Sequence, residues 1–186
     1  MTTRAIWRIG CRDRWLSASP QSRRCVNLCW KRFPLLNKDF KEFIESLRSN
    51  AVDFLIVGAH ALAAHGRPRY TGDIDIWVRP ERDNLARLIT ALDVFGFASL
   101  GVSIEDFLVP EAMVQLGYPP ARIDLLTAID GVTFDECFDA RVEATVAGTT
   151  LPVISIEHLI RNKLATGRGK DLVDVESLRE SPLWKR

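Results

Sequence analysis

The sequence predicts an α/β (α+β) fold in which a small mixed β-sheet is flanked by helices. Segments with helical periodicity alternate along the chain with short apolar runs that have the length of strands. The chain has 186 residues, 47% of them hydrophobic, which is enough for one hydrophobic core. We therefore expect one folded domain, which we place at residues 35–186.

Four main elements are predicted in the first part of this domain. Apolar residues recur at i, i+3, i+4 and i+7 after Asn37, which can cap a helix. A strand follows at residues 54–57, and a glycine turn with a short helix separates it from a second strand at residues 73–78. Pro80 opens a further helix, which Gly96 ends.

Two pairs of short strands and two helices are predicted in the second part of the domain. Residues 97–110 carry no clear pattern apart from one helical turn. Ser155 can cap the first of the two helices, and Gly167 and Gly169 separate it from the second. The expected strands, of which the first two form an antiparallel hairpin, are residues 112–116, 122–129, 141–146 and 151–154.

Two aspartates one residue apart begin the strand at residues 73–78. Side chains alternate between the faces of a strand, so Asp73 and Asp75 point the same way. Neighbouring carboxylates repel each other, more so when buried, and the arrangement therefore requires a cation. Oxygen ligands with room for water and phosphate suit Mg²⁺. Upstream, Gly58 and Ala59 lie between a strand and a helix, where their backbone N–H groups can face a phosphate.

The order of these features resembles the nucleotidyltransferase superfamily that includes DNA polymerase β. The signature of this superfamily begins with a hydrophobic residue followed by Gly-Ser or Gly-Gly. A spacer comes next, and the signature ends with Asp-hydrophobic-Asp. In this sequence the spacer is residues 60–72. The resemblance extends from Leu36 to Leu178 and is greatest for small bacterial nucleotidyltransferases linked to toxin–antitoxin and abortive-infection systems. An Arg-x-Thr-x-Asp-x-Asp run is familiar in those proteins, and here it consists of Arg69, Thr71, Asp73 and Asp75.

The superfamily also requires a third carboxylate on a later strand, and Asp124 has the expected apolar surroundings. Alternation places Arg122, Asp124 and Leu126 on one strand face. Taken alone, Asp124 could form a salt bridge with Arg122, and the residues after the first strand could be a plain helix-entry turn. It is the joint order and spacing of these features that favours the transferase fold.

The resemblance implies a set of site residues. Asp73, Asp75 and Asp124 would be the catalytic and metal-binding carboxylates, with Mg²⁺ or Mn²⁺ as the cofactor. The C-terminal helices would pack beside the site, where Lys163 lies at the edge of an apolar stripe and can place its ammonium in a cleft. Asp171 and Asp174 are expected to hold Arg or Lys side chains and not metal. The residues expected to bind the nucleotide are Gly58, Ala59, Arg69, Thr71, Lys163 and Lys170.

The implied activity is transfer of a nucleoside monophosphate from an NTP, with ATP expected, to a protein or RNA acceptor such as tRNA. A toxin–antitoxin-type system would supply a cognate toxin as partner. However, Ala59 stands where the family has Ser or Gly. A second functional class therefore stays open, in which the protein has the same fold but is catalytically weak and acts like an antitoxin by binding a partner. A nuclease or phosphatase that uses the same metals is a third, weaker alternative.

Residues 1–34 form a basic extension with eight basic side chains and one acidic side chain. The remaining residues carry 17 basic and 23 acidic side chains, a balance that makes the domain a poor unaided nucleic-acid binder. The extension could be a basic arm that contacts RNA or a transit peptide. We favour a third interpretation, a poorly ordered segment upstream of the natural start. Cys25 and Cys29 have no matching His or Cys pair, which argues against zinc.

The remaining reactive side chains are expected to be structural. The three histidines, His60, His65 and His158, are interpreted as packing or surface residues. Cys137 has no histidine nearby in the sequence, so we do not expect it to be a nucleophile. The chain has neither a secretion signal nor an apolar run long enough to span a membrane, and we expect a reduced, cytoplasmic protein.

Overall fold

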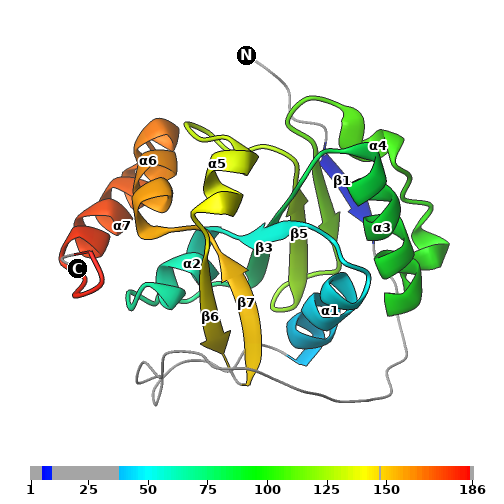
Figure 1. Cartoon of the computed structure of the whole chain (residues 1–186), viewed down its shortest axis with the longest axis horizontal. Coiled ribbons are helices and arrows are strands. Elements are labelled where there is room, and N and C mark those ends of the chain that lie inside the picture. The colour runs from blue at the N-terminus through cyan, green and yellow to red at the C-terminus, as the bar shows by residue number, and fades with distance from the viewer. Residues whose placement is uncertain (1–5, 10–37, 147, 185–186) are drawn as a thin grey trace.

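The computed structural model of the protein describes residues 6–9, 38–146 and 148–184. It contains a mixed sheet of seven strands in the order β1-β4-β5-β3-β2-β7-β6, with helices packed around it (Figure 1). The predicted fold class is confirmed. The strands are β1 (Ile6–Ile9), β2 (Phe54–Ile56), β3 (Asp73–Val78), β4 (Met113–Leu116), β5 (Arg122–Leu126), β6 (Val142–Val146) and β7 (Thr149–Val153).

Seven α-helices lie within the described ranges. After α3 the chain continues through a π-helical turn (Asp93–Phe97) and a short 3₁₀ turn (Ala98–Leu100). Figure 1 shows α6 and α7 together on one side of the molecule, with α1 and α3 on the other. The α-helices are α1 (Lys38–Ser49), α2 (Gly58–Ala64), α3 (Arg82–Leu92), α4 (Glu105–Leu108), α5 (Phe134–Asp139), α6 (Ile156–Thr166) and α7 (Gly169–Arg179).

The centre of the sheet explains how the short apolar runs become strands. β3 pairs parallel with β5 on one side and antiparallel with β2 on the other. The alternate residues Ile74, Ile76 and Val78 of β3 are fully buried, as are most neighbouring residues of β2 and β5. Side chains alternate along a strand, so the intervening residues of β3, which include Asp73 and Asp75, lie on the opposite face of the sheet.

The helices differ from the predicted boundaries mainly near Gly96. The helical pattern after Pro80 was expected to end at this glycine, but α3 itself ends at Leu92 and the chain continues as the π-helical turn. Gly96 has φ +105° inside that turn, a conformation that interrupts a regular α-helix. The predicted hairpin is confirmed as β4 and β5, and β5 ends at Leu126, three residues before its expected end.

The N-terminal extension contributes one described element. β1 pairs parallel with β4 at the edge of the sheet, with Ile6 opposite Met113 and Ile9 opposite Leu116. A strand edge offers main-chain hydrogen bonds to any extended segment, so this pairing does not need an alternating side-chain pattern. The other residues of the extension lie outside the described part of the chain, as do Cys25 and Cys29, and the division at residue 35 stays a prediction. No helix in the described ranges has the length and apolar character that spanning a membrane requires.

Candidate active site

Strand register brings three carboxylates together. β3 and β5 run parallel, with Asp75 opposite Asp124 and Asp73 opposite Arg122. Because these positions are two apart on each strand, all four side chains project from the same face of the sheet. Asp124 is buried, and Asp73 and Asp75 are half-buried. The structure therefore joins the three aspartates that the sequence pattern selected.

Arg122 is bound within this group of carboxylates. Its Nε and Nη2 donate hydrogen bonds to Asp124 Oδ1 and Oδ2 at 2.8 and 2.9 Å, and its Nη2 also donates to Asp73 Oδ2. Gln115 Nε2 donates to Asp124 Oδ2 at 3.4 Å, and Thr71 Oγ1 donates to Asp73 Oδ1. Arg122 was not among the site residues expected from the sequence. The alternation of side chains along the strand, which placed Arg122 on the same face as Asp124, could have identified it.

Asp75 differs from the other two aspartates because no side chain within the described ranges donates a hydrogen bond to it. Burial, together with the charges of Asp73 and Asp124, raises the pKa of Asp75 to about 6. Burial also raises the pKa of Asp124, against the opposing effect of Arg122. Carboxylates whose ionised forms are disfavoured in this way gain most from a nearby cation.

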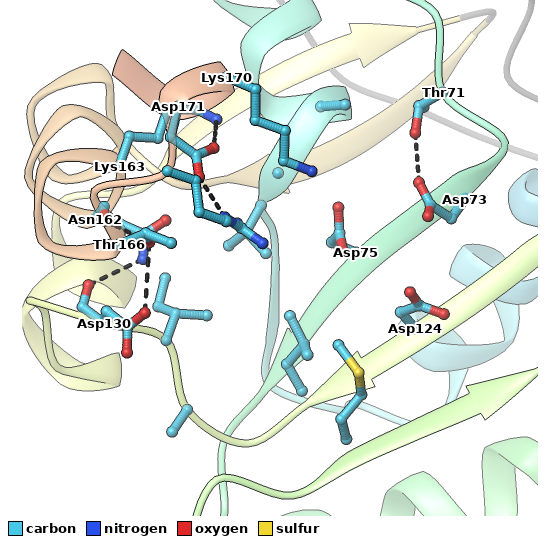
Figure 2. A pocket seen from close by; sticks show the side chains of 18 of the residues that line it. Thr71, Asp73, Asp75, Asp124, Asp130, Asn162, Lys163, Thr166, Lys170 and Asp171 are labelled. Atoms are coloured by element: carbon cyan, nitrogen blue, oxygen red, sulfur yellow. Dashed lines mark hydrogen bonds and ion pairs between the residues drawn. The ribbon is translucent and has the colours of Figure 1, made fainter. Parts of the chain in front are cut away.

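The aspartates form one wall of a cleft of about 350 Å³. Gly58 and Ala59, at the start of α2, line it next to the carboxylates, and α6 and the start of α7 form the opposite wall. Figure 2 shows the Lys170 side chain directed into the cleft, on the side that faces Asp75. The cleft thus places acidic side chains opposite basic ones.

Lys163 is bound by two aspartates and is almost completely buried. Its Nζ donates to Asp171 Oδ1 at 3.1 Å and to Asp174 Oδ2 at 2.7 Å, and 4% of the side chain is exposed. Arg168 Nε donates to Asp171 at 2.6 Å, and Arg69 Nε donates to Asp174 at 3.4 Å. The expectation that Asp171 and Asp174 hold basic side chains is confirmed by these contacts. Lys163 borders the cleft, but its ammonium is already paired.

The end of the cleft beside α6 contains polar groups that the sequence analysis did not select. Asn162 Nδ2 donates to the Asp130 backbone oxygen at 2.9 Å, and Thr166 Oγ1 donates to the Asn162 backbone oxygen at 2.9 Å. Figure 2 shows these three residues together, away from Asp73 and Asp124. Asn162 and Thr166 are four residues apart on a helix and therefore share a face, and this spacing could have identified them from the sequence.

Two of the three histidines pack as expected. His65 is buried, and its ring Nε2 lies 2.8 Å from the backbone oxygen of Ile154. His60 packs edge-on against Phe40, with ring centroids 5.7 Å apart. Burial lowers the pKa of both histidines and favours their neutral forms.

The third histidine lies next to the cysteine of the domain. Ligand atoms of His158, Cys137 and Glu136 lie within 4.8 Å of one another, a proximity that the 21-residue separation in sequence did not indicate. Burial raises the pKa of Cys137 to about 12, which keeps the thiol protonated. His158 Nδ1 lies 2.9 Å from Ser155 Oγ. The raised pKa agrees with the prediction that Cys137 is not a nucleophile, although the structure places beside it a histidine that its sequence neighbourhood lacks.

The carboxylate cluster fits a divalent cation. Asp73, Asp75 and Asp124 supply six oxygens on neighbouring strands, which is the hard donor set that Mg²⁺ and Mn²⁺ prefer. The oxygens of Asp75 accept no side-chain hydrogen bond within the part of the chain that the structure describes, and burial together with the charges of Asp73 and Asp124 disfavours its ionised form. The donor set is chemically suited to a divalent cation, but among the described residues the group whose ligand atoms all lie within 4.8 Å of one another is Glu136, Cys137 and His158.

A mixed sheet that carries three carboxylates beside a glycine turn defines a nucleotidyltransferase fold. The chain belongs to the family described as "Nucleotidyl transferase of unknown function (DUF2204)", which matches residues 36–182. This confirms the superfamily that the sequence pattern indicated.

Solved structures show the same fold at low sequence identity. The lincosamide antibiotic adenylyltransferase LnuA, in its lincomycin-bound form, matches with a TM-score of 0.50 and 15% identity over 78% of this chain and 98% of that chain. A Thermotoga maritima protein assigned as a nucleotidyltransferase matches with a TM-score of 0.50 and 18% identity over 78% of this chain and 90% of that chain. The sequence has no significant match among the curated proteins with which it was compared.

Proposed function

We propose that this protein is a metal-dependent nucleotidyltransferase that moves a nucleoside monophosphate from an NTP to an acceptor hydroxyl. The observation that carries this proposal is the register of β3 and β5, which puts Asp75 opposite Asp124 at the mouth of a cleft with basic side chains on its other wall. Acidic residues suit metal ions and basic residues suit phosphates, so the cleft matches a metal–nucleotide complex.

In this proposal Asp73, Asp75 and Asp124 hold Mg²⁺ or Mn²⁺. The bound metal would neutralise charge on the nucleotide phosphates and lower the pKa of the acceptor hydroxyl. The acceptor oxygen forms a bond to the α-phosphorus, the bond from the α-phosphorus to the bridging oxygen breaks, and pyrophosphate leaves. Asp124 is the group we assign either to accept the proton of the hydroxyl or to lower the pKa of that hydroxyl through the metal.

The phosphates would lie between α2 and the start of α7. Lys170 and Arg168 are exposed at the cleft and supply positive charge, and Gly58 and Ala59, which line the same space, would offer the backbone N–H groups that begin α2. Lys163 and Arg69, which were expected to bind the nucleotide, would instead hold the walls of the cleft, because Asp171 and Asp174 bind the Lys163 ammonium and Asp174 also binds Arg69.

Thr71 is assigned to the loop before β3. Its hydroxyl donates to Asp73, which fixes the orientation of that carboxylate. Sequence analysis left open whether Thr71 binds phosphate or holds the loop, and this hydrogen bond favours the second role.

The acceptor supplies the hydroxyl that receives the nucleoside monophosphate. We retain a protein or an RNA such as tRNA as the acceptor, ATP as the nucleotide, a toxin–antitoxin-type setting with a cognate toxin, and a cytoplasmic location. LnuA, an antibiotic adenylyltransferase solved with lincomycin, adds a small hydroxyl-bearing molecule as an alternative acceptor. In each case the chemistry at the carboxylates is the same.

Incubation with each α-³²P-labelled NTP, Mg²⁺ and cell extract tests the activity. The wild type should transfer label to a discrete acceptor and release pyrophosphate, while an Asp73→Asn/Asp75→Asn double variant should not. Asp83→Asn, which changes an exposed aspartate of α3, is the matched control and should retain activity. If the double variant still binds its partner fully and the wild type incorporates none of the four nucleotides, the protein acts by binding, like an antitoxin. Phosphate release without transfer would indicate a nuclease or phosphatase.

A further inference from the structure

The guanidinium of Arg122 is held between two of the three carboxylates. It donates two hydrogen bonds to Asp124, on its own strand, and one to Asp73, on the neighbouring strand. Hydrogen bonds between a guanidinium and carboxylates are charge-assisted, and the planar fork of arginine fixes their direction. The contact is therefore an oriented one, unlike a loose ion pair on a protein surface.

These hydrogen bonds occupy the oxygens that a divalent cation would bind. Both oxygens of Asp124 accept from Arg122, and Oδ2 accepts from Gln115 as well. The two oxygens of Asp73 accept from Thr71 and from Arg122. A cation that binds Asp73 and Asp124 would approach the same oxygens and would be repelled by the guanidinium beside them, so the two cations compete for these carboxylates.

We propose that Arg122 is an internal counter-cation that competes with the divalent metal for Asp73 and Asp124 and is released toward the nucleotide when metal binds. This inference rests on the proposed function. The Arg122 side chain lines the cleft and is 27% exposed, so the released guanidinium can turn into the cleft without breaking the core. The nucleotide phosphates can then accept its hydrogen bonds.

The charges at the cluster agree with this competition. Three ionised carboxylates and one guanidinium leave a net charge of −2, so the cluster still attracts a divalent cation while Arg122 is in place. Removal of the guanidinium leaves −3 and frees the oxygens of Asp124, which strengthens the attraction. Arg122 is thus a positioning residue that lowers metal affinity in the absence of nucleotide and couples metal binding to nucleotide binding.

Calorimetric titration with MnCl₂ at pH 8 tests the proposal without any measurement of activity. Arg122→Gln should bind Mn²⁺ roughly tenfold more tightly than the wild type, which is the effect of about 1.4 kcal/mol of lost competition. Arg122→Lys keeps a charge but not the planar fork, so its affinity should lie between the two. Arg79→Gln is the matched control, because Arg79 also binds three carboxylates, Asp53, Glu81 and Asp135, that are not among the cleft residues. It should leave Mn²⁺ affinity unchanged.

A second titration measures the coupling. In the wild type, Mn²⁺ should increase the affinity for a non-hydrolysable ATP analogue by a larger factor than in Arg122→Gln, because only the wild type releases a guanidinium. In parallel, the NMR signal of the Arg122 Nε–H group, assigned by its loss in Arg122→Lys, should shift and lose protection from hydrogen exchange as Mg²⁺ is added. This signal comes from the wild-type protein and does not depend on whether the glutamine variant folds.

The outcomes separate this inference from the proposed function. If the wild type binds Mn²⁺ and Arg122→Gln binds it equally well or more weakly, the role proposed for Arg122 is wrong. The transferase proposal is not affected by that result. An Arg122 Nε–H signal that Mg²⁺ does not change overturns the role of Arg122 as well. Wild type that binds neither Mn²⁺ nor the metal–nucleotide complex overturns the transferase proposal itself.

Discussion

Gly58 lies directly against the carboxylate of Asp75. The backbone at Gly58 has φ +60°, and a β-carbon at this position would overlap Oδ2 of Asp75. Two independent requirements therefore select glycine here, the left-handed backbone and the close approach of a carboxylate. The glycine turn and the second aspartate of the Asp-x-Asp pair, separated by 16 residues in the sequence, form one packed unit.

Gly58→Ala is expected to displace the Asp75 carboxylate and to abolish metal binding. Gly101→Ala is the matched control, since Gly101 has φ +66° and a β-carbon added there would meet nothing within 4 Å. Both variants should lose about 1–2 kcal/mol of stability through the left-handed backbone, but only Gly58→Ala should also lose Mn²⁺ binding in calorimetry. Equal metal affinity in the two variants would contradict the packing role assigned to Gly58.

Lys163→Met is expected to destabilise the fold strongly, because it leaves Asp171 and Asp174 buried without their shared ammonium. Loss of one partner from a buried ion pair costs about 3–5 kcal/mol, which urea unfolding would measure. The triple variant Lys163→Met/Asp171→Asn/Asp174→Asn should recover much of the loss, since it also removes the two buried negative charges, which would keep only their contacts with Arg168 and Arg69. A Lys163→Met protein as stable as the wild type would show that the network contributes little.

Lys170→Met should weaken nucleotide binding and leave stability almost unchanged. The Lys170 side chain is exposed and directed into the cleft (Figure 2). Loss of one charge-assisted contact to a phosphate should reduce affinity for an ATP analogue roughly tenfold. Lys38→Met, on α1, provides the control because Lys38 is exposed and pairs with Glu42 at the surface. If both variants bind the analogue equally well, the phosphates do not lie beside Lys170.

Asp75 gives the protein a defined pH dependence. Its pKa of about 6 in the folded protein is above its ordinary value of 3.8, so the folded state binds more protons between these values. In EDTA, the stability that Asp75 contributes is present below pH 4 and is lost as the pH rises through 6. Asp75→Asn should therefore raise the melting temperature in EDTA at pH 7.5 and not at pH 4, with Asp83→Asn as the control. The reverse pattern would contradict the assigned pKa.

The same titration should limit metal binding at acid pH. A protonated Asp75 cannot act as a carboxylate ligand, so the apparent affinity for Mn²⁺ should fall as the pH decreases from 7.5 to 5. Calorimetry at several pH values would measure this decrease. Affinity that is constant over this range would indicate that Asp75 is not a ligand.

The convergence of Asp73, Asp75 and Asp124 could be predicted because alternation along a strand fixes the face of each side chain. The pairing of β3 with β5, which makes the faces adjacent, came from the family resemblance and not from either strand. Arg122 was visible on the same face, but sequence does not decide whether an arginine beside an aspartate binds one carboxylate or two. That choice depends on strand register, which the structure supplies.

Lys163 shows a different limit. Its position at the edge of the apolar stripe of α6 predicted an ammonium in the cleft; Lys163 borders the cleft, but Asp171 and Asp174 bind its ammonium. The pairing with Asp171 and Asp174 depends on how α7 folds back against α6 after the glycine break, which local periodicity does not specify. Asp130 was not selected for a similar reason, since its neighbours Asn162 and Thr166 come from a helix more than 30 residues later.

Asp174 links parts of the chain that have no direct connection in sequence. It binds Lys163 of α6 and also Arg69, from the loop that leads through Thr71 into β3. Two residues after α7, Ser181 Oγ donates to the backbone oxygen of His65 at 2.8 Å. Asp174 and Ser181 thus hold both ends of the segment from His65 to Arg69. A chain shortened before α7 would lose both contacts, and with them the support of the loop whose Thr71 orients the Asp73 carboxylate.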